Sequence, residues 1–326
     1  MKKNLLALLA LSAAAMTLAQ CTAPVMVPHQ EKKFVNIYKP DGDKFFGPDT
    51  KYLKEGQWYD QWVANDHTFV RHTDGSWHIF GITHPLVLTD PLSDGIHDGE
   101  YASFHAVSPP AHFHGTLGSD YYADKPKVLP PSDRPGEILP NHAPYIFVKD
   151  EVYHMIYGHS PIRMATSADL YKWTPQGELF SDKDGARDPN ILLINGTYHL
   201  VYCSLKCVKM VTSKDLKQWS EPKVILRTNK FDPESPSLIS HNGRFYLFVC
   251  SWDGNWDKKE VVGAYQNKTY VYQSEDPSDF GTDNEQQITT LLAHAPEIFQ
   301  DEHGDWFISS AEWPARGVSV DRFTWE

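Results

Sequence analysis

The feature that most constrains the fold is an internal repeat that occurs five times. Each unit has a short apolar segment, a turn containing Gly, Asp or Asn, and an aromatic-rich segment that alternates, which is the pattern of a β-hairpin. The units start at residues 66, 143, 188, 235 and 295. A second phrase, Thr-Ser followed by a leucine and a tryptophan, recurs at residues 166–173 and 212–219. This phrase predicts a third strand that ends at Thr-Ser and a fourth that follows the tryptophan.

The spacing of the repeats indicates the architecture. Successive units start 45 to 77 residues apart, and repeats of about 40–50 residues with four strands are typical of β-propellers. The sequence therefore predicts an all-β fold, a five-bladed β-propeller with four-stranded antiparallel blades around a central funnel. Arranging the sheets in a ring leaves only short strand edges exposed.

One large domain accounts for most of the chain. Its 326 residues are 41% hydrophobic, enough for a sizeable core. We expect the propeller domain at residues 61–326, preceded by a lead-in segment at residues 21–60. Residues 34–38 of the lead-in are expected to pair with the last blade and close the ring. The long first interval carries an insertion around residues 84–140, which is rich in Pro, His and Gly.

The N-terminus has the layout of a secretory signal. Lys2 and Lys3 precede an apolar run at residues 5–15, and we place a signal peptide at residues 1–20. The run is too short to span a bilayer. Cleavage after Ala19 or before Cys21 would fit, the latter because residues 18–21 resemble the lipobox of bacterial lipoproteins. Either cleavage predicts export from the cytoplasm, to the periplasm, the cell surface or the medium.

The charge balance narrows the range of partners. Lysine plus arginine number 30 against 42 acidic residues, a net charge of −12. An acidic chain repels phosphate backbones and anionic lipid headgroups. We therefore expect no nucleic-acid partner, and contact with a membrane only through an N-terminal lipid anchor.

Cysteine and histidine spacing does not indicate a metal site. Cys203, Cys207 and Cys250 lack the spacing of a zinc motif, and we interpret them as buried structural thiols. His112 and His114 would share one face of a strand, but no third ligand accompanies them. We interpret these two, with His97 and His105 of the same insertion, as residues of the pocket rim or the solvated surface.

The repeats differ where their inner strands begin, and in a propeller these residues line the funnel. Burying several like charges together costs several kcal/mol, so such a group is expected where the charges are solvated or take part in binding or catalysis. The sequence therefore favours a functional pocket over a packed polar hub. One layer of equivalent positions holds Asp66, Ala143, Asp188, Ser235 and Ala295, and the layer before it holds Asn65, His142, Arg187, Glu234 and His294.

Three carboxylic acids in one pocket suit glycoside hydrolysis. One carboxylate attacks the sugar or activates water, a protonated acid supplies a proton to the leaving oxygen, and the transition state favours nearby negative charge. Mutual repulsion raises the proton affinity of at least one acid, as a general acid requires near neutral pH. Asp66, Asp188 and Glu234 are therefore the candidate catalytic residues.

The chain resembles the five-bladed propeller glycosidases of families 43 and 32 in three motifs, Asn65-Asp66, Arg187-Asp188-Pro189 and Glu234-Ser235-Pro236. The resemblance implies that Asp66 is the base of an inverting enzyme (family 43) or the nucleophile of a retaining enzyme (family 32). It also implies that Asp188 stabilises the transition state and tunes its neighbour, and that Glu234 is the general acid.

The substrate class follows from the same resemblance. Asp66 precedes His67-Thr68 where the fructosidase family has Pro-Asn-Gly, and the Ala-Pro pairs at 143–144 and 295–296 look like the arabinosidase and xylosidase family. The implied reaction removes a terminal arabinofuranose, xylose or fructose unit from an oligo- or polysaccharide. Two alternatives remain: a non-catalytic glycan-binding propeller of an uptake system, and a glycoside phosphorylase with Arg163, Arg187 and Lys206 as phosphate ligands.

Supporting residues complete the prediction. The residues expected to bind substrate are Asn65, His142, Arg187, Trp252 and His294, and further rings for stacking on a sugar are Trp62, Trp256 and Trp313. No cofactor is required, although some family 43 members hold a calcium ion near the propeller axis, for which His294 is the candidate ligand. Glu297 is expected to point away from the axis by strand alternation, and it is the fallback acid if Glu234 is misaligned.

Overall fold

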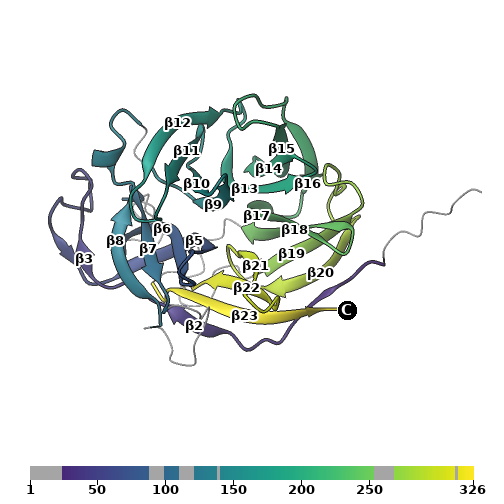
Figure 1. The fold of residues 1–326 in the computed structure, drawn as a ribbon, viewed down its shortest axis with the longest axis horizontal. Coiled ribbons are helices and arrows are strands. Elements are labelled where there is room, and N and C mark those ends of the chain that lie inside the picture. Colours follow the sequence, from purple (N-terminus) through teal and green to yellow (C-terminus); the bar gives the residue numbers. More distant parts are fainter. Residues whose placement is uncertain (1–23, 88–98, 110–120, 138–139, 253–267, 313–314) are drawn as a thin grey trace, which may run out of the picture.

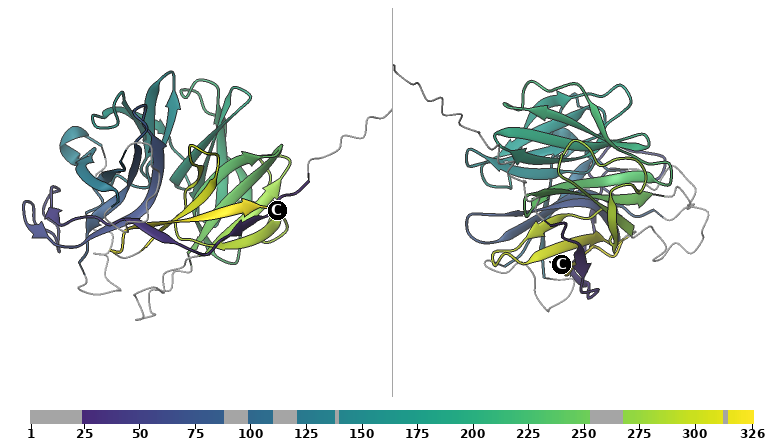
Figure 2. Two further views of the ribbon diagram at one scale, coloured as in Figure 1. Left: turned by 60° about the horizontal axis from the view of Figure 1, so that its bottom comes forward. Right: turned by 90° about the vertical axis from the view of Figure 1, so that its right-hand side faces the viewer.

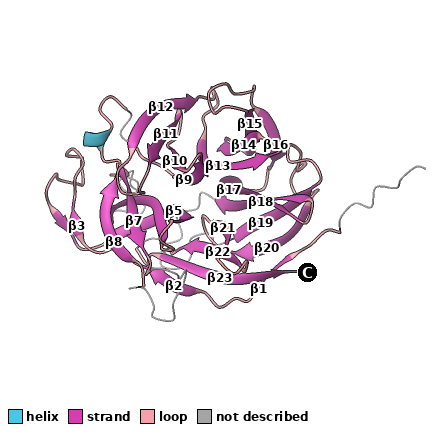
Figure 3. Cartoon of the chain, viewed as in Figure 1, coloured by secondary structure: helices cyan, strands magenta, loops and turns pink. Residues whose placement is uncertain are grey.

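Five β-sheets surround a common axis in the computed structural model of the chain (Figure 1). The structure describes residues 24–87, 99–109, 121–137, 140–252, 268–312 and 315–326. Within these ranges the chain forms strands and loops, and its one helical element is a 3-10 turn at Pro131–Asp133 (Figure 3). The predicted five-bladed, antiparallel propeller is confirmed.

Four blades are simple meanders of four antiparallel strands. The first contains β5 (Trp62–Arg71), β6 (Trp77–Pro85), β7 (Ala102–Val107) and β8 (Ala123–Val128). The second contains β9 (Tyr145–Lys149), β10 (Val152–Tyr157), β11 (Ile162–Ser167) and β12 (Thr174–Phe180). The third contains β13 (Arg187–Ile194), β14 (Thr197–Ser204), β15 (Cys207–Ser213) and β16 (Lys223–Arg227). The fourth contains β17 (Asp232–His241), β18 (Arg244–Trp252), β19 (Lys268–Ser274) and β20 (Gln287–Leu292).

The fifth blade joins the two ends of the described chain. Its own strands are β21 (Ile298–Gln300), β22 (Trp306–Ala311) and β23 (Val318–Trp325). Two N-terminal strands, β1 (Pro28–Gln30) and β2 (Val35–Tyr38), both pair with β23, and Figure 2 shows them beside it at the ring's edge. A separate small hairpin, β3 (Asp43–Lys44) with β4 (Trp58–Tyr59), follows. The ring is therefore closed by strands from opposite ends of the sequence.

The predicted insertion at residues 84–140 needs a correction. Strands β7 and β8 lie inside it and form the outer half of the first blade, so only the connections around them are additional. His105 belongs to β7, where its Nε2 lies 2.8 Å from His78 Nδ1 and its ring stacks on Phe80. This histidine therefore packs in the blade rather than at a pocket rim.

The repeated Thr-Ser phrase has a local structural cause. The Ser167 hydroxyl accepts hydrogen bonds from the backbone N–H groups of Asp169 and Leu170, and the Asp169 carboxylate accepts two more from the next residues. Residues 213–218 repeat this turn with the same partners. Because the turn satisfies its own backbone donors, it ends the third strand of the second and third blades.

The core lies within and between the blades, as the alternation along the strands dictates. Buried tyrosine rings occupy matching positions on the second strands of the second and third blades, Tyr157 and Tyr202. The part of the chain that the structure describes contains no helix long and apolar enough to cross a membrane.

Candidate active site

A β-bulge opens the inner strand of three blades, next to the funnel. The strand register shifts between Ala64 and His67 on β5, between Arg187 and Asn190 on β13, and between Glu234 and Ser237 on β17. Bulges bend a strand and re-aim its side chains, and they are frequent beside active sites. The bulges of the three blades therefore bring side chains of different types together beside the funnel.

A left-handed residue followed by proline interrupts or precedes the inner strand in four of the five blades. Asp188 and Ser235 have φ values of 55° and 45°, and Ala143 and Ala295 at the equivalent positions have 42° and 45°. A proline follows each of the four residues. Proline has no N–H to donate to a strand ladder, so it is accommodated at a bulge or a strand end. The first blade lacks this proline, and Asp66 is followed by His67.

The residues just before and within the bulges line a pocket of about 840 Å³. This volume lies within the range of small-molecule sites. Of the predicted site residues, those that line the pocket are Asn65, Asp66, His142, Arg187, Asp188 and Glu234. The structure thus brings the three candidate acids, which are far apart in sequence, to one cavity.

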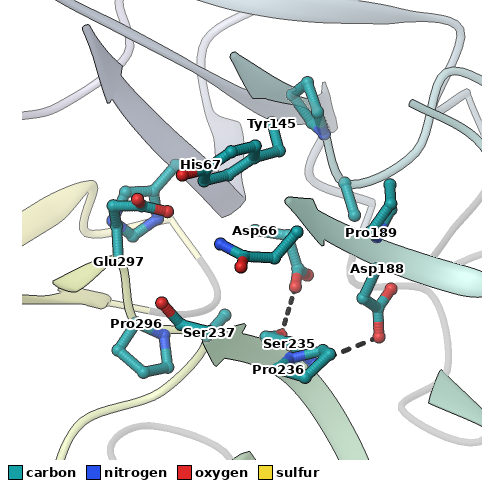
Figure 4. Close-up of a pocket in the computed structure, with 14 residues that line it drawn as sticks. Asp66, His67, Tyr145, Asp188, Pro189, Ser235, Pro236, Ser237, Pro296 and Glu297 are labelled. Carbon is teal, nitrogen blue, oxygen red and sulfur yellow. Dashed lines mark hydrogen bonds between the residues drawn. The ribbon is translucent and has the colours of Figure 1, made fainter. Parts of the chain in front are cut away.

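Arg187 and Ser235 connect the three acids directly. Arg187 Nη1 lies 2.6 Å from Asp188 Oδ2 and 3.4 Å from Glu234 Oε1. The Ser235 backbone N–H donates to Asp188 Oδ2 at 3.2 Å, and its hydroxyl donates to Asp66 Oδ1 (Figure 4). Arg187 also donates to the carbonyl of Pro233, at 2.9 Å, which fixes the guanidinium. The carboxylates are therefore held in a defined arrangement.

The three acids have different proton affinities. Burial and the nearby Asp188 charge raise the pKa of Asp66 to about 6. Burial raises the pKa of Glu234 to about 8, with Arg187 opposing the shift and the other two acids adding to it. Burial would also raise the pKa of Asp188, but the charges of Arg187 and His142 hold it well below its usual range. Near neutral pH, Asp188 and Asp66 are therefore ionised while Glu234 retains its proton.

His142 contributes a positive charge to this group. Its Nδ1 lies 3.5 Å from Asp188 Oδ1, and its Nε2 lies 3.7 Å from Glu100 Oε2. Burial alone would lower the pKa of His142, but the surrounding carboxylates raise it to about 9. Sequence reasoning selected His142 for substrate binding and missed Glu100, because an isolated acid in an inserted loop gives no signal.

A second, smaller cavity of about 30 Å³ lies deeper along the axis. Figure 4 shows Asp66 at its boundary with Glu297, Tyr145 and Ser237 around it. The prediction that Glu297 points away from the axis is therefore wrong. This residue precedes β21 and follows the left-handed Ala295, so uninterrupted strand alternation does not apply to it.

His294 and Trp62, which were also predicted to contact the substrate, are both buried. His294 is 2% exposed, and its ring nitrogens contact Cys250 Sγ at 3.3 Å and Asn65 Oδ1 at 3.1 Å. Trp62 is 1% exposed and stacks on Phe46 in the core, so it cannot bind a sugar face. The side chain of Trp252 lies outside the part of the chain that the structure describes. The same holds for five whole residues: Trp256, Trp313, His97, His112 and His114.

Comparisons with known proteins agree with this geometry. Residues 183–324 match the sequence model of Glycosyl hydrolases family 43. No curated protein matches the chain in sequence. The match favours family 43 over family 32 as the group that the motifs resemble.

Solved structures show the same fold at low sequence identity. An exo-1,5-α-L-arabinanase from a bovine ruminal metagenomic library is 18% identical with a TM-score of 0.56, covering 81% of this chain and 92% of its own. An α-L-arabinofuranosidase from Clostridium thermocellum is 15% identical with a TM-score of 0.58, covering 79% and 88%. A compost-metagenome β-xylosidase/α-arabinofuranosidase, in a calcium-free complex with xylotriose, is 13% identical with a TM-score of 0.56, covering 81% and 91%.

Proposed function

We propose that the chain is a glycoside hydrolase similar to the five-bladed propeller enzymes of family 43, and that it releases a terminal arabinofuranosyl or xylosyl unit from an oligo- or polysaccharide. One observation carries the proposal: three acids in one pocket have separate proton affinities, with Glu234 protonated and Asp66 ionised near neutral pH. This is the division of labour that glycosidic hydrolysis requires.

We propose an inverting mechanism, because residues 183–324 match the sequence model of family 43, and the resemblance to that family implies an inverting enzyme with Asp66 as its base. Glu234 donates its proton to the glycosidic oxygen as the bond to the anomeric carbon breaks. Asp66 accepts a proton from a water molecule that attacks the opposite face of the sugar. Asp188, ionised beside Arg187 and His142, stabilises the positive charge of the transition state. The anomeric configuration of the first product, followed by nuclear magnetic resonance, tests this: inversion is expected, and net retention would contradict it.

The first prediction concerns the acid and the base. Removing either proton-transfer group in Asp66→Asn or Glu234→Gln should lower kcat about 10²- to 10⁴-fold. The measurement uses aryl arabinofuranosides, aryl xylosides and the corresponding oligosaccharides, with sugar binding followed by calorimetry. Hydrolysis at the parent rate in both variants would contradict the assigned roles. Sugar binding without turnover in the parent would instead support a glycan-binding propeller.

The phosphorylase alternative has less support. Arg163 is buried and lies 3.7 Å from Glu137, away from the pocket lining. Lys206 lines the pocket, but its Nζ lies 2.8 Å from Asp232. These cations are thus balanced by carboxylates rather than gathered around a phosphate-sized space. Product analysis in phosphate buffer distinguishes the reactions, since a sugar phosphate would indicate phosphorolysis.

We expect hydrolysis to need no cofactor, and the residues do not favour calcium at His294. His294 offers a ring nitrogen next to the sulfur of Cys250, whereas calcium prefers six to eight oxygen ligands. The axial cavity beside Glu297 and Ser237 offers such oxygens. Native mass spectrometry with added calcium checks this assignment: an ion held by the parent and lost in Glu297→Gln is expected, and equal binding by both would contradict it.

We further propose that the chain is exported, with either a free N-terminus near Gln20 or a lipid-modified Cys21. The basic residues and apolar run at its start support this. Mass spectrometry of the mature N-terminus decides between the two forms, and an intact Met1 on the purified cellular protein would contradict export.

A further inference from the structure

Three side chains with different metal-binding atoms meet behind the catalytic pocket. A carboxylate oxygen of Glu234, the sulfur of Cys250 and a ring nitrogen of His294 all lie within 4.8 Å of one another. Cys250 is the direct partner of Glu234 in the pairing of β17 with β18. His294 approaches from the fifth blade, with its Nδ1 3.3 Å from the sulfur. Adjacent blades therefore supply one compact cluster.

The cluster is buried but can be reached. Cys250 and His294 are 0% and 2% exposed, whereas Glu234 lines the substrate pocket. An ion entering the pocket would meet the carboxylate first and the sulfur and nitrogen behind it. The backbone N–H of Ala295 also points at the sulfur, at 3.4 Å, and such a donor favours negative charge on Cys250.

The ligand types identify the class of ion. Zinc and similar borderline-soft cations bind cysteine sulfur, histidine nitrogen and carboxylate oxygen, with three protein ligands leaving a fourth position open. Calcium and magnesium prefer oxygen ligands alone. We propose that Glu234, Cys250 and His294 form an inhibitory site for zinc or a related divalent cation, which enters through the substrate pocket.

Binding of the metal ion releases protons from its ligands. The thiol of Cys250 is protonated at rest, because burial raises its pKa. When the metal–sulfur and metal–oxygen bonds form, the protons of Cys250 and Glu234 pass to solvent, so binding weakens as the pH falls. A water molecule completes the fourth position. With its carboxylate bound to the ion, Glu234 cannot protonate a leaving group; this inhibition, unlike the binding itself, rests on the proposed function.

The chain offers a matched control for the test. Cys203 is as buried as Cys250 and occupies the equivalent position in the third blade, opposite Arg187. Cobalt titration reports thiolate ligation through a sulfur-to-metal charge-transfer band, and calorimetry measures zinc binding to the metal-free protein. The parent and Cys203→Ser should give the band and equal zinc affinity. Cys250→Ser should lose the band and bind zinc at least about 10-fold more weakly, and His294→Gln should weaken it similarly.

Each outcome decides one part of the proposal. No band in the parent, or an unchanged band in Cys250→Ser, would overturn the site, and neither result depends on hydrolysis. Zinc should inhibit the parent and Cys203→Ser equally, and Cys250→Ser at least about 10-fold less, each relative to its own metal-free rate. If zinc saturates the site while hydrolysis continues, the site stands and the acid role of Glu234 is contradicted.

Discussion

At the scale of single residues, the site depends on charges that control one another. Asp188 is ionised because Arg187 and His142 neutralise it, and Asp66 is a stronger base than an ordinary aspartate because it is buried beside Asp188. Glu100 links this group to the first blade through His142. The protonation states needed for catalysis are therefore a property of the cluster rather than of any one acid.

A charge change at His142 tests this interdependence. The imidazolium lowers the pKa of Asp66, so His142→Asn should raise that pKa and move the acid limb of kcat/KM to higher pH. At pH 6 the expected fall in kcat/KM is about 10-fold.

His159 provides the control for His142→Asn. It also lines the pocket, with its ring 5.4 Å from that of His142. Burial lowers the pKa of His159, so this ring is neutral where the enzyme works. His159→Asn should leave the acid limb in place. An equal shift in both variants would show that the effect is structural rather than electrostatic.

At the scale of strands and loops, turn motifs in the sequence predicted the number of blades. They did not predict every strand of the first blade or the direction of Glu297. The hairpin turns and the Thr-Ser phrase identified the repeats because they satisfy backbone groups locally. Strands β7 and β8 were assigned to an insertion because the first blade lacks that phrase. The direction of Glu297 could not be predicted, since this residue lies before β21 and after the left-handed Ala295, where strand alternation does not apply. The contact of Glu100 with His142 depends on tertiary structure alone.

The closure of the ring gives a prediction at this scale. Asp321 on β23 is 2% exposed, and its two oxygens accept hydrogen bonds from the backbone of Lys32 and Lys33, at 2.9 and 3.0 Å. Asp321→Ala removes the charged acceptor of two partly buried hydrogen bonds and should lower the free energy of unfolding by about 1–3 kcal/mol. Urea unfolding at constant m-value measures this loss.

Asp305 in the same blade is the control for Asp321→Ala. Its carboxylate lies 2.6 Å from Arg322, but both side chains are more than 40% exposed. Solvent screens such a pair, so Asp305→Ala should cost less than about 1 kcal/mol. Equal losses in the two variants would argue against a special role of the hydrogen bonds to Asp321 in closing the ring.

At the scale of the whole molecule, the ring of blades brings residues that are far apart in the sequence close together in space. Asp66, Asp188 and Glu234 come from the first, third and fourth blades and line one pocket. The repeat predicted this convergence because equivalent positions in a propeller face one axis. The repeat also put Glu234 and His294 in one layer. It could not predict that Cys250 lies beside both, since the register shift between Glu234 and Ser237 sets how β17 pairs with β18.

The dependence of kcat/KM on pH, measured with aryl arabinofuranosides and xylosides, tests the central claim most directly. Catalysis requires Asp66 without its proton and Glu234 with its proton, so activity should rise through about pH 6 and fall through about pH 8. With an activated aryl leaving group, Glu234→Gln should retain the acid limb and lose the alkaline limb. An unchanged alkaline limb in Glu234→Gln would contradict the account.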